Sequence, residues 1–201
     1  MSAAAEILAD PRIWQAVVAG LFLSLGWVVN GIGQRSAAAR LRHERLRDSH
    51  RALYAEIGVN LDALGGPEAL EAHADRMVTR MEAEPGFVPF VPSERATPVF
   101  EGLVEHIHIL PRVTIDPIVA YYSQMEAVRA LVQDMRGEGY AALSPERRGA
   151  IYRDYIEMKV QAFSYGDYAL RLIAAFAEGG KEGAEAEAAR ISSRDAGPSV
   201  P

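Results

Sequence analysis

Cysteine is absent from this chain of 201 residues, and its absence excludes several kinds of chemistry at once. Without thiols the protein has no disulfides, no thiolate nucleophile and no sulfur-ligated zinc or iron–sulfur centre. The sequence also lacks a Gly-x-Gly-x-x-Gly fingerprint, a P-loop and a nucleophile elbow. Packing of apolar side chains therefore has to hold the fold, and the sequence predicts no catalytic residue, no cofactor and no bound metal.

Charge is missing from residues 13–34, between Arg12 and Arg35. Because a helix rises about 1.5 Å per residue, this stretch covers a bilayer core of roughly 30 Å and predicts a transmembrane helix. The arginine-rich flank after it predicts a short extracytoplasmic N-terminus at 1–12 and a cytoplasmic C-terminal domain. The expected location is therefore the inner (plasma) membrane, crossed once. The alternative is a signal peptide cleaved at the small residues 36–39. A signal peptide has a shorter apolar stretch than this one, so a retained anchor is favoured.

Two sets of residues are predicted to act at the membrane. Arginines of a juxtamembrane basic helix, residues 35–64, would attract anionic headgroups: Arg35, Arg40, Arg42, Arg45 and Arg47. Small residues of the apolar helix would let two such helices pack closely: Ala16, Gly20 and Ser24. The coiled-coil-like spacing of His43, His50 and Asn60 also leaves a homodimer open, although a solvated helix edge is the favoured explanation. The expected partners are a lipid bilayer and a protein of unknown identity.

Helical periodicity dominates the rest of the chain, and no alternating strand pattern competes with it. Gly65-Gly66-Pro67 predicts the end of one helix and the start of the next. Apolar residues then recur at spacings of three and four, which indicates a bundle domain over 65–180 and, after the transmembrane helix, a cytoplasmic bundle of about five helices. Residues 181–201 are poor in large apolar side chains and predict a flexible tail, within which 181–191 could form a helix. The predicted fold class is all-α.

Proline punctuates residues 85–92, Pro-Gly-Phe-Val-Pro-Phe-Val-Pro, which we call the strap. Proline excludes helix and restricts the residue before it, so the strap is predicted to be extended. Phe87 and Phe90 then either pack into a groove of the bundle or form a docking patch for a protein partner. Tyr152 and Tyr168 lie off the apolar stripe of the last helix and are further candidate partner contacts.

Glu105 and His108 form a Glu-x-x-His pair, the kind that supplies metal ligands in di-iron helical bundles. Such a site needs a second pair, and the sequence contains none. The net charge of −6 argues against a nucleic-acid surface. The favoured function is a membrane-anchored, non-enzymatic scaffold or adaptor. The alternatives are a membrane accessory factor for a transporter or phage-type lysis system, and a metal-dependent bundle enzyme.

Overall fold

The computed structural model describes residues 11–195, and the side chains of several residues between 11 and 36 fall outside that description. Every regular element in this range is a helix, which confirms the all-α prediction. The helices are α2 (Pro11–Leu64), α3 (Pro67–Ala83), α4 (Pro98–Leu103), the 3-10 helix η1 (Val104–Ile109), α5 (Arg112–Met135), α6 (Glu138–Ala141) and α7 (Pro145–Asp195). The chain divides into two compact units, Met1–Arg45 and Leu46–Pro201.

The structure does not support the transmembrane helix that the sequence predicted. Among the residues that the structure describes, no helix combines the length and the apolar character needed to cross a membrane. The prediction of a transmembrane span at 13–34, and with it a single-pass inner-membrane location, is therefore wrong. The physical reason is that a stretch without charge is not a stretch without polar groups. Gln15, Asn30 and Gln34 carry amides that are costly to move out of water without hydrogen-bond partners.

Glycine and proline set the boundary between the first two helices as the sequence predicts. Helix α2 ends at Leu64, where Gly65 and Gly66 take positive φ values of 76° and 91° that L side chains rarely adopt. Pro67 then opens α3 in its first turn, a position where the missing N–H costs nothing. The compact unit begins at Leu46, so the second half of the predicted 35–64 segment belongs to the bundle.

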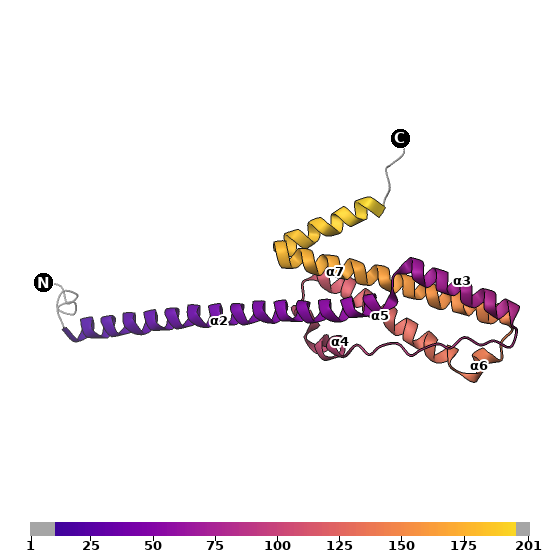
Figure 1. Cartoon of the computed structure of the whole chain (residues 1–201). Coiled ribbons are helices and arrows are strands. Elements are labelled where there is room, and N and C mark those ends of the chain that lie inside the picture. The colour runs from indigo at the N-terminus through magenta and orange to yellow at the C-terminus, as the bar shows by residue number, and fades with distance from the viewer. Residues whose placement is uncertain (1–10, 196–201) are drawn as a thin grey trace. The chain divides into compact units, whose positions relative to one another are not determined.

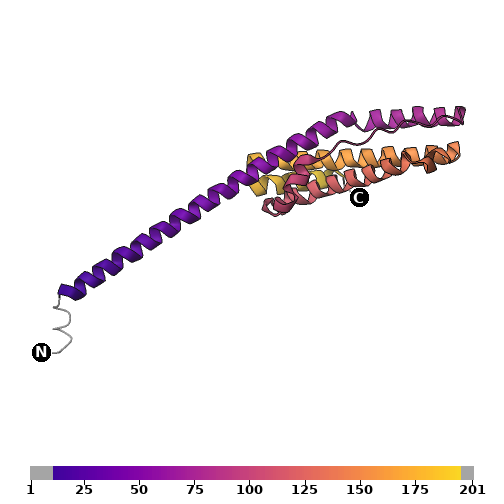
Figure 2. The same ribbon diagram turned by 90° about the horizontal axis from the view of Figure 1, so that it is seen from below.

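Helix α7 is the element against which the bundle is built, because α3 and α5 both pack along it (Figures 1 and 2). Two apolar clusters follow one another along this packing. The first contains side chains of α3, α5, α6 and the first part of α7, together with Val91 of the strap. The second contains Leu53, Ile57 and Leu61 of α2, together with residues of α5 and the later part of α7. The connector, residues 84–97, joins α3 to α4 and runs back along the bundle.

Residues 181–195 are helical, which differs from the flexible tail predicted for 181–201; residues 196–201 lie outside the described range. Gly180 interrupts α7 with φ 64° and ψ −151°, and the chain turns back beyond it (Figure 1). A Cβ at Gly183 would lie 2.7 Å from the carbonyl oxygen of Ala175, so glycine permits a close approach of the two helical segments. Ala184 is buried, and Arg171 pairs with Glu187 across the turn at 2.7 Å. The composition of this segment did not predict these contacts, because few of its side chains are large and apolar.

Candidate functional site

The strap carries Phe90, the most exposed large apolar side chain among the described residues of the Leu46–Pro201 unit. Its side chains alternate between inside and outside, as in a strand: Pro89 and Val91 are buried, whereas Val88 and Phe90 are 40% and 84% exposed. Phe87 is half-buried against the first apolar cluster, and the Arg80 guanidinium lies 4.0 Å from the centre of its ring. The two phenylalanines predicted to act together are therefore separated. Phe87 packs against the bundle and Phe90 faces solvent.

Arg148 holds the beginning of the strap. This residue of α7 is buried, and its guanidinium donates to the carbonyl oxygens of Ala141 (3.2 Å), Leu143 (2.7 Å) and Pro85. A buried cation needs such acceptors because leaving it unpaired would cost several kcal/mol or more. Two of these carbonyls lie at the end of α6 and in the loop after it, and the third belongs to the strap, so Arg148 ties the start of the strap to the connection between α6 and α7.

A buried polar triad holds the connector just after the strap. The Glu94 carboxylate accepts hydrogen bonds from the Tyr155 hydroxyl and the Lys159 ammonium, both at 3.0 Å, and Lys159 also donates to the Tyr155 oxygen at 3.0 Å. The side chains of Lys159 and Glu94 are only 12% and 10% exposed. Burial, reinforced by the Glu94 charge, raises the pKa of Tyr155 well above its ordinary range. The phenol therefore stays protonated and acts as a donor.

Glu56 of α2 holds the end of the connector, where α4 begins. Its carboxylate accepts from the backbone N–H groups of Val99 (2.8 Å) and Phe100 (3.1 Å), and from the Tyr122 hydroxyl (2.7 Å). The first N–H groups of a helix have no partner within the helix, so a carboxylate placed there satisfies them. The Phe100 ring stacks on Tyr122 with centroids 3.8 Å apart. Contacts from α2, α5 and α7 thus hold the chain at Pro85, at Glu94 and at the start of α4.

The two tyrosines predicted as partner contacts differ in the structure. Tyr152 is buried, and its hydroxyl lies 3.0 Å from Nε2 of His73, so it does not reach the surface as the sequence suggested. Tyr168 is half-buried and lines an open groove of about 590 Å³ beside Phe163, Tyr165 and Arg171. Arg171 is already paired with Glu187. This groove therefore has aromatic walls but no uncommitted cation among the residues that line it.

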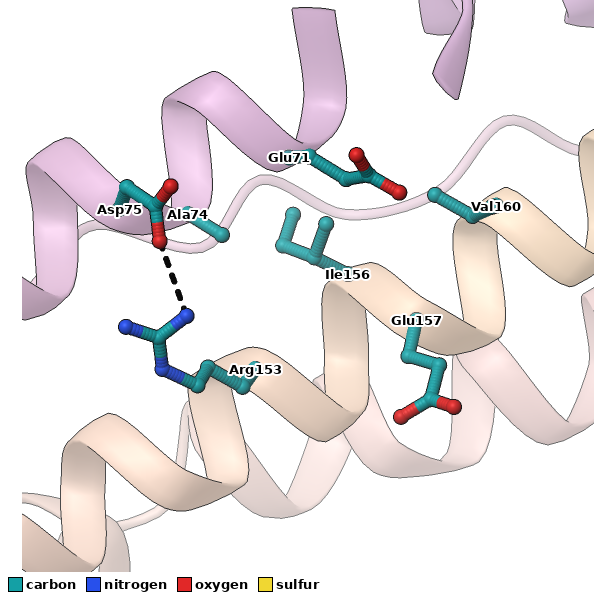
Figure 3. Close-up of a pocket in the computed structure, with 7 residues that line it drawn as sticks. All are labelled: Glu71, Ala74, Asp75, Arg153, Ile156, Glu157 and Val160. Atoms are coloured by element: carbon teal, nitrogen blue, oxygen red, sulfur yellow. Dashed lines mark hydrogen bonds and ion pairs between the residues drawn. The ribbon is translucent and has the colours of Figure 1, made fainter. Parts of the chain in front are cut away.

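A second open groove of about 520 Å³ lies between α3 and α7 (Figure 3). Figure 3 shows Asp75 and Arg153 facing each other across the groove, and they pair at 2.9 Å. Glu71 and Glu157 complete the polar lining, while Ala74 and Ile156 lie on its apolar side. The one arginine pairs with Asp75, and the residues that line this groove include no hydroxyl, thiol or imidazole group.

Glu105 and His108, the candidate metal pair, lie on η1, and both are exposed. Within residues 11–195 the side chains that the structure describes form no group of three or more potential metal ligands. The pair therefore finds no third ligand in this part of the chain. The spacing of the two residues was the only signal for a metal site.

The three polar residues with coiled-coil-like spacing, His43, His50 and Asn60, form a seam along α2 and differ in burial. His43 is exposed, whereas His50 and Asn60 are buried inside this one chain. Nε2 of His50 lies 3.0 Å from the Thr114 hydroxyl, which itself donates to the Pro111 carbonyl, so Nε2 of His50 is the donor. Burial lowers the pKa of His50 to about 4. The polar residues of the seam at positions 50 and 60 thus serve intrachain packing.

The residues predicted to act at the membrane lie mainly in the Met1–Arg45 unit. The arginines Arg35, Arg40, Arg42, Arg45 and Arg47 are all exposed. Gly20 and Ser24 are exposed one turn apart, and the Ser24 hydroxyl donates to the Gly20 carbonyl oxygen at 2.8 Å within the helix. The side chain of Ala16 lies outside the described residues. Because the membrane span that motivated these assignments is overturned, none of them is retained as a membrane contact.

Comparison of the sequence with known protein families, with curated proteins and with solved structures finds no match.

Proposed function

We propose that this chain is a non-enzymatic helical scaffold or adaptor that presents the strap to a protein partner. The observation that carries the proposal is the Phe90 side chain, which is 84% exposed between two points, Pro85 and Glu94, that are bonded to the bundle. Arg148 holds the strap before Phe90, and the Glu94 triad holds the chain after it. The exposed ring is therefore part of an ordered surface.

The energetics of Phe90 support a binding role. Full burial of a phenylalanine side chain contributes about 1.5–3 kcal/mol, and this chain leaves nearly all of that gain unused. A partner with an apolar pocket could recover it on binding. Because the backbone around Phe90 is already held in place, little ordering entropy would be lost, which favours affinity. Aromatic side chains of this kind are common anchors of protein interfaces.

The test compares capture of partners by tagged full-length wild type, Phe90→Ala and the control Val119→Ala. Val119 of α5 is also an exposed apolar residue, at 40%, but lies outside the strap. We expect the wild type and Val119→Ala to capture the same protein after cross-linking, and Phe90→Ala to lose it. A partner captured equally well by all three chains, or no partner at all, would overturn the proposal.

Stability measurements separate binding from folding in the same set of variants. Phe90→Ala should leave the unfolding midpoint nearly unchanged, because the ring makes little contact with the bundle. Phe87→Ala should lower stability by about 1–3 kcal/mol, because its ring is half-buried against the first apolar cluster. If Phe90→Ala destabilises the chain as much as Phe87→Ala, the loss of capture would reflect unfolding and the binding role of Phe90 would be refuted.

A further inference from the structure

The last helical segment of α7, residues 181–195, which we call the arm, contacts the bundle through few and mostly small side chains. Ile191 is its only large apolar residue and is half-buried. Among the described side chains, neither apolar cluster contains a residue of the arm. The buried and half-buried positions of the arm share one face of the helix: Gly183, Ala184, Glu187, Ala188 and Ile191. The arm therefore adds little to the apolar core.

A carboxylate of the arm links it to the earlier part of α7. Glu187 accepts hydrogen bonds from Nε and Nη2 of Arg171, at 3.0 and 2.7 Å, and its side chain is 15% exposed. Arg190, within the arm, donates to the same carboxylate and orients it. In a straight helix, Arg171 and Glu187 would lie about 24 Å apart, because each residue adds about 1.5 Å. This ion pair therefore exists only while the arm is folded back.

Gly180 is the hinge between the arm and the rest of α7. Its φ of 64° and ψ of −151° lie in a region that is accessible essentially to glycine alone. Gly179 keeps helical angles, and the segments on both sides are rich in alanine and glutamate, which favour helix. Because glycine also adopts helical angles, a change at this one residue lets the arm continue α7 as a straight helix. The two positions of the arm thus differ in the backbone of Gly180 and in the contacts of Glu187.

We propose that the arm is a lid that moves about Gly180 between the folded position (Figure 1) and a straight continuation of α7. The open groove of about 590 Å³ is lined by Tyr168 of the earlier segment and by Ile191 of the arm. When the arm straightens, the groove loses the wall that the arm supplies, and its aromatic side chains become more accessible. The lid controls a surface that contains no residue of the strap, so the inference goes beyond the proposed function and does not rest on it.

The free-energy difference between the two positions is small because its contributions oppose one another. The folded position gains the Arg171–Glu187 pair and the close approach of Gly183 to Ala175. The Arg171 side chain is 35% exposed, and ion pairs exposed to this degree contribute modestly and are screened by salt. The straight position gains the helical hydrogen bonds that an interruption of the helix removes. Salt should therefore shift the arm toward the straight position.

Pulsed electron spin resonance on the full-length chain measures the position of the arm. The chain has no cysteine, so spin labels attach only at introduced thiols. Ala150→Cys and Ala189→Cys replace two exposed alanines outside the groove and give a doubly labelled parent chain. Because Arg171 meets Glu187 in the folded position, the two labels are then about 30 Å apart, whereas a straight helix separates them by about 58 Å. We expect both distances in the parent chain, with the longer one gaining between about 0.05 M and about 1 M KCl.

Two pairs of variants of the parent chain test the ion pair and the hinge. Arg171→Gln should raise the ratio of straight to folded arm about three- to tenfold. Arg112→Gln, which removes an exposed ion pair with Asp116 on α5, should leave the ratio unchanged. Gly180→Ala should raise it at least about tenfold, because alanine does not tolerate the angles of the hinge. Gly179→Ala, the same change one residue earlier, should stay within about threefold of the parent.

Urea unfolding of the same variants separates movement of the arm from unfolding of the bundle. All four should unfold near the midpoint of the parent chain, because neither apolar cluster contains a described residue of the arm. A long distance accompanied by a lower midpoint in both Arg171→Gln and Gly180→Ala would reflect unfolding and would overturn the proposal. A single short distance at every salt concentration, a single long distance in the parent chain, or an equal response of Gly180→Ala and Gly179→Ala would overturn it too.

Discussion

His50 should make the stability of this protein sensitive to mild acid. The ring is buried between Thr114 and Phe176, whose ring centre lies 5.0 Å from that of His50. Burial lowers its pKa from 6.5 to about 4, so the native state disfavours the charged form. The unfolded chain binds a proton first as the pH falls. The contribution of neutral His50 is therefore complete above pH 6.5 and is lost progressively between pH 6.5 and 4.

The magnitude follows from the two pKa values. The two pKa values differ by between two and three, and a difference of one in pKa corresponds to about 1.36 kcal/mol, so the full loss is about 3 kcal/mol. At pH 5 the same linkage gives a loss of about 2 kcal/mol. For a protein whose total stability is of the usual order, about 5–15 kcal/mol, such a loss is easily measured.

Urea unfolding between pH 7.5 and 4.5 measures this effect. His50→Gln keeps a side-chain donor for Thr114 but does not titrate, so the difference in unfolding free energy between wild type and His50→Gln isolates the histidine from the carboxylates. We expect this difference to fall by about 2 kcal/mol from pH 7.5 to pH 5. His43→Gln is the matched control, because His43 is exposed, and its profile should follow the wild type. Parallel profiles of wild type and His50→Gln would refute the reasoning.

Two further predictions concern packing and buried charge. Gly166→Ala should destabilise the chain by about 1–3 kcal/mol in thermal unfolding, because the new Cβ would lie 2.8 Å from Leu61 Cδ2, whereas Gly149→Ala, with 3.4 Å to its nearest neighbour, should not. Lys159→Met should cost about 3–5 kcal/mol in urea unfolding by leaving Glu94 buried and unpaired, and adding Glu94→Gln should restore part of the loss. Additive effects of the last two changes would contradict a coupled pair.

The prediction from sequence was most successful for the local breaks in the chain. Gly65-Gly66-Pro67 separates two helices as expected, and the prolines of the strap keep it out of helix. It was least successful where the character of a whole segment was inferred from its lack of charge or from its amino-acid composition. Residues 13–34 lack charge but not polar groups, and residues 181–195 form a helix although their composition suggested a flexible tail.

The sequence located the candidate site but did not predict which of its side chains packs against the bundle and which faces solvent. Phe87 and Phe90 occupy equivalent places in two consecutive copies of Phe-Val-Pro, so no local signal distinguishes the packed ring from the exposed one. The missing information was the position of distant groups. Glu94 and Lys159 lie 65 residues apart, and Pro85 and Arg148 lie 63 apart, yet these pairs fix how the strap faces the bundle.

The sequence by itself determined the helical fold class and the main breaks between helices, because backbone preferences and apolar periodicity act over a few neighbouring residues. Tertiary structure alone decided that His50 is buried and neutral, that Tyr152 is inaccessible, and that Phe90 faces solvent. Burial and long-range hydrogen bonds depend on which helices pack together. That packing depends on the whole folded unit and not on neighbouring residues in the sequence.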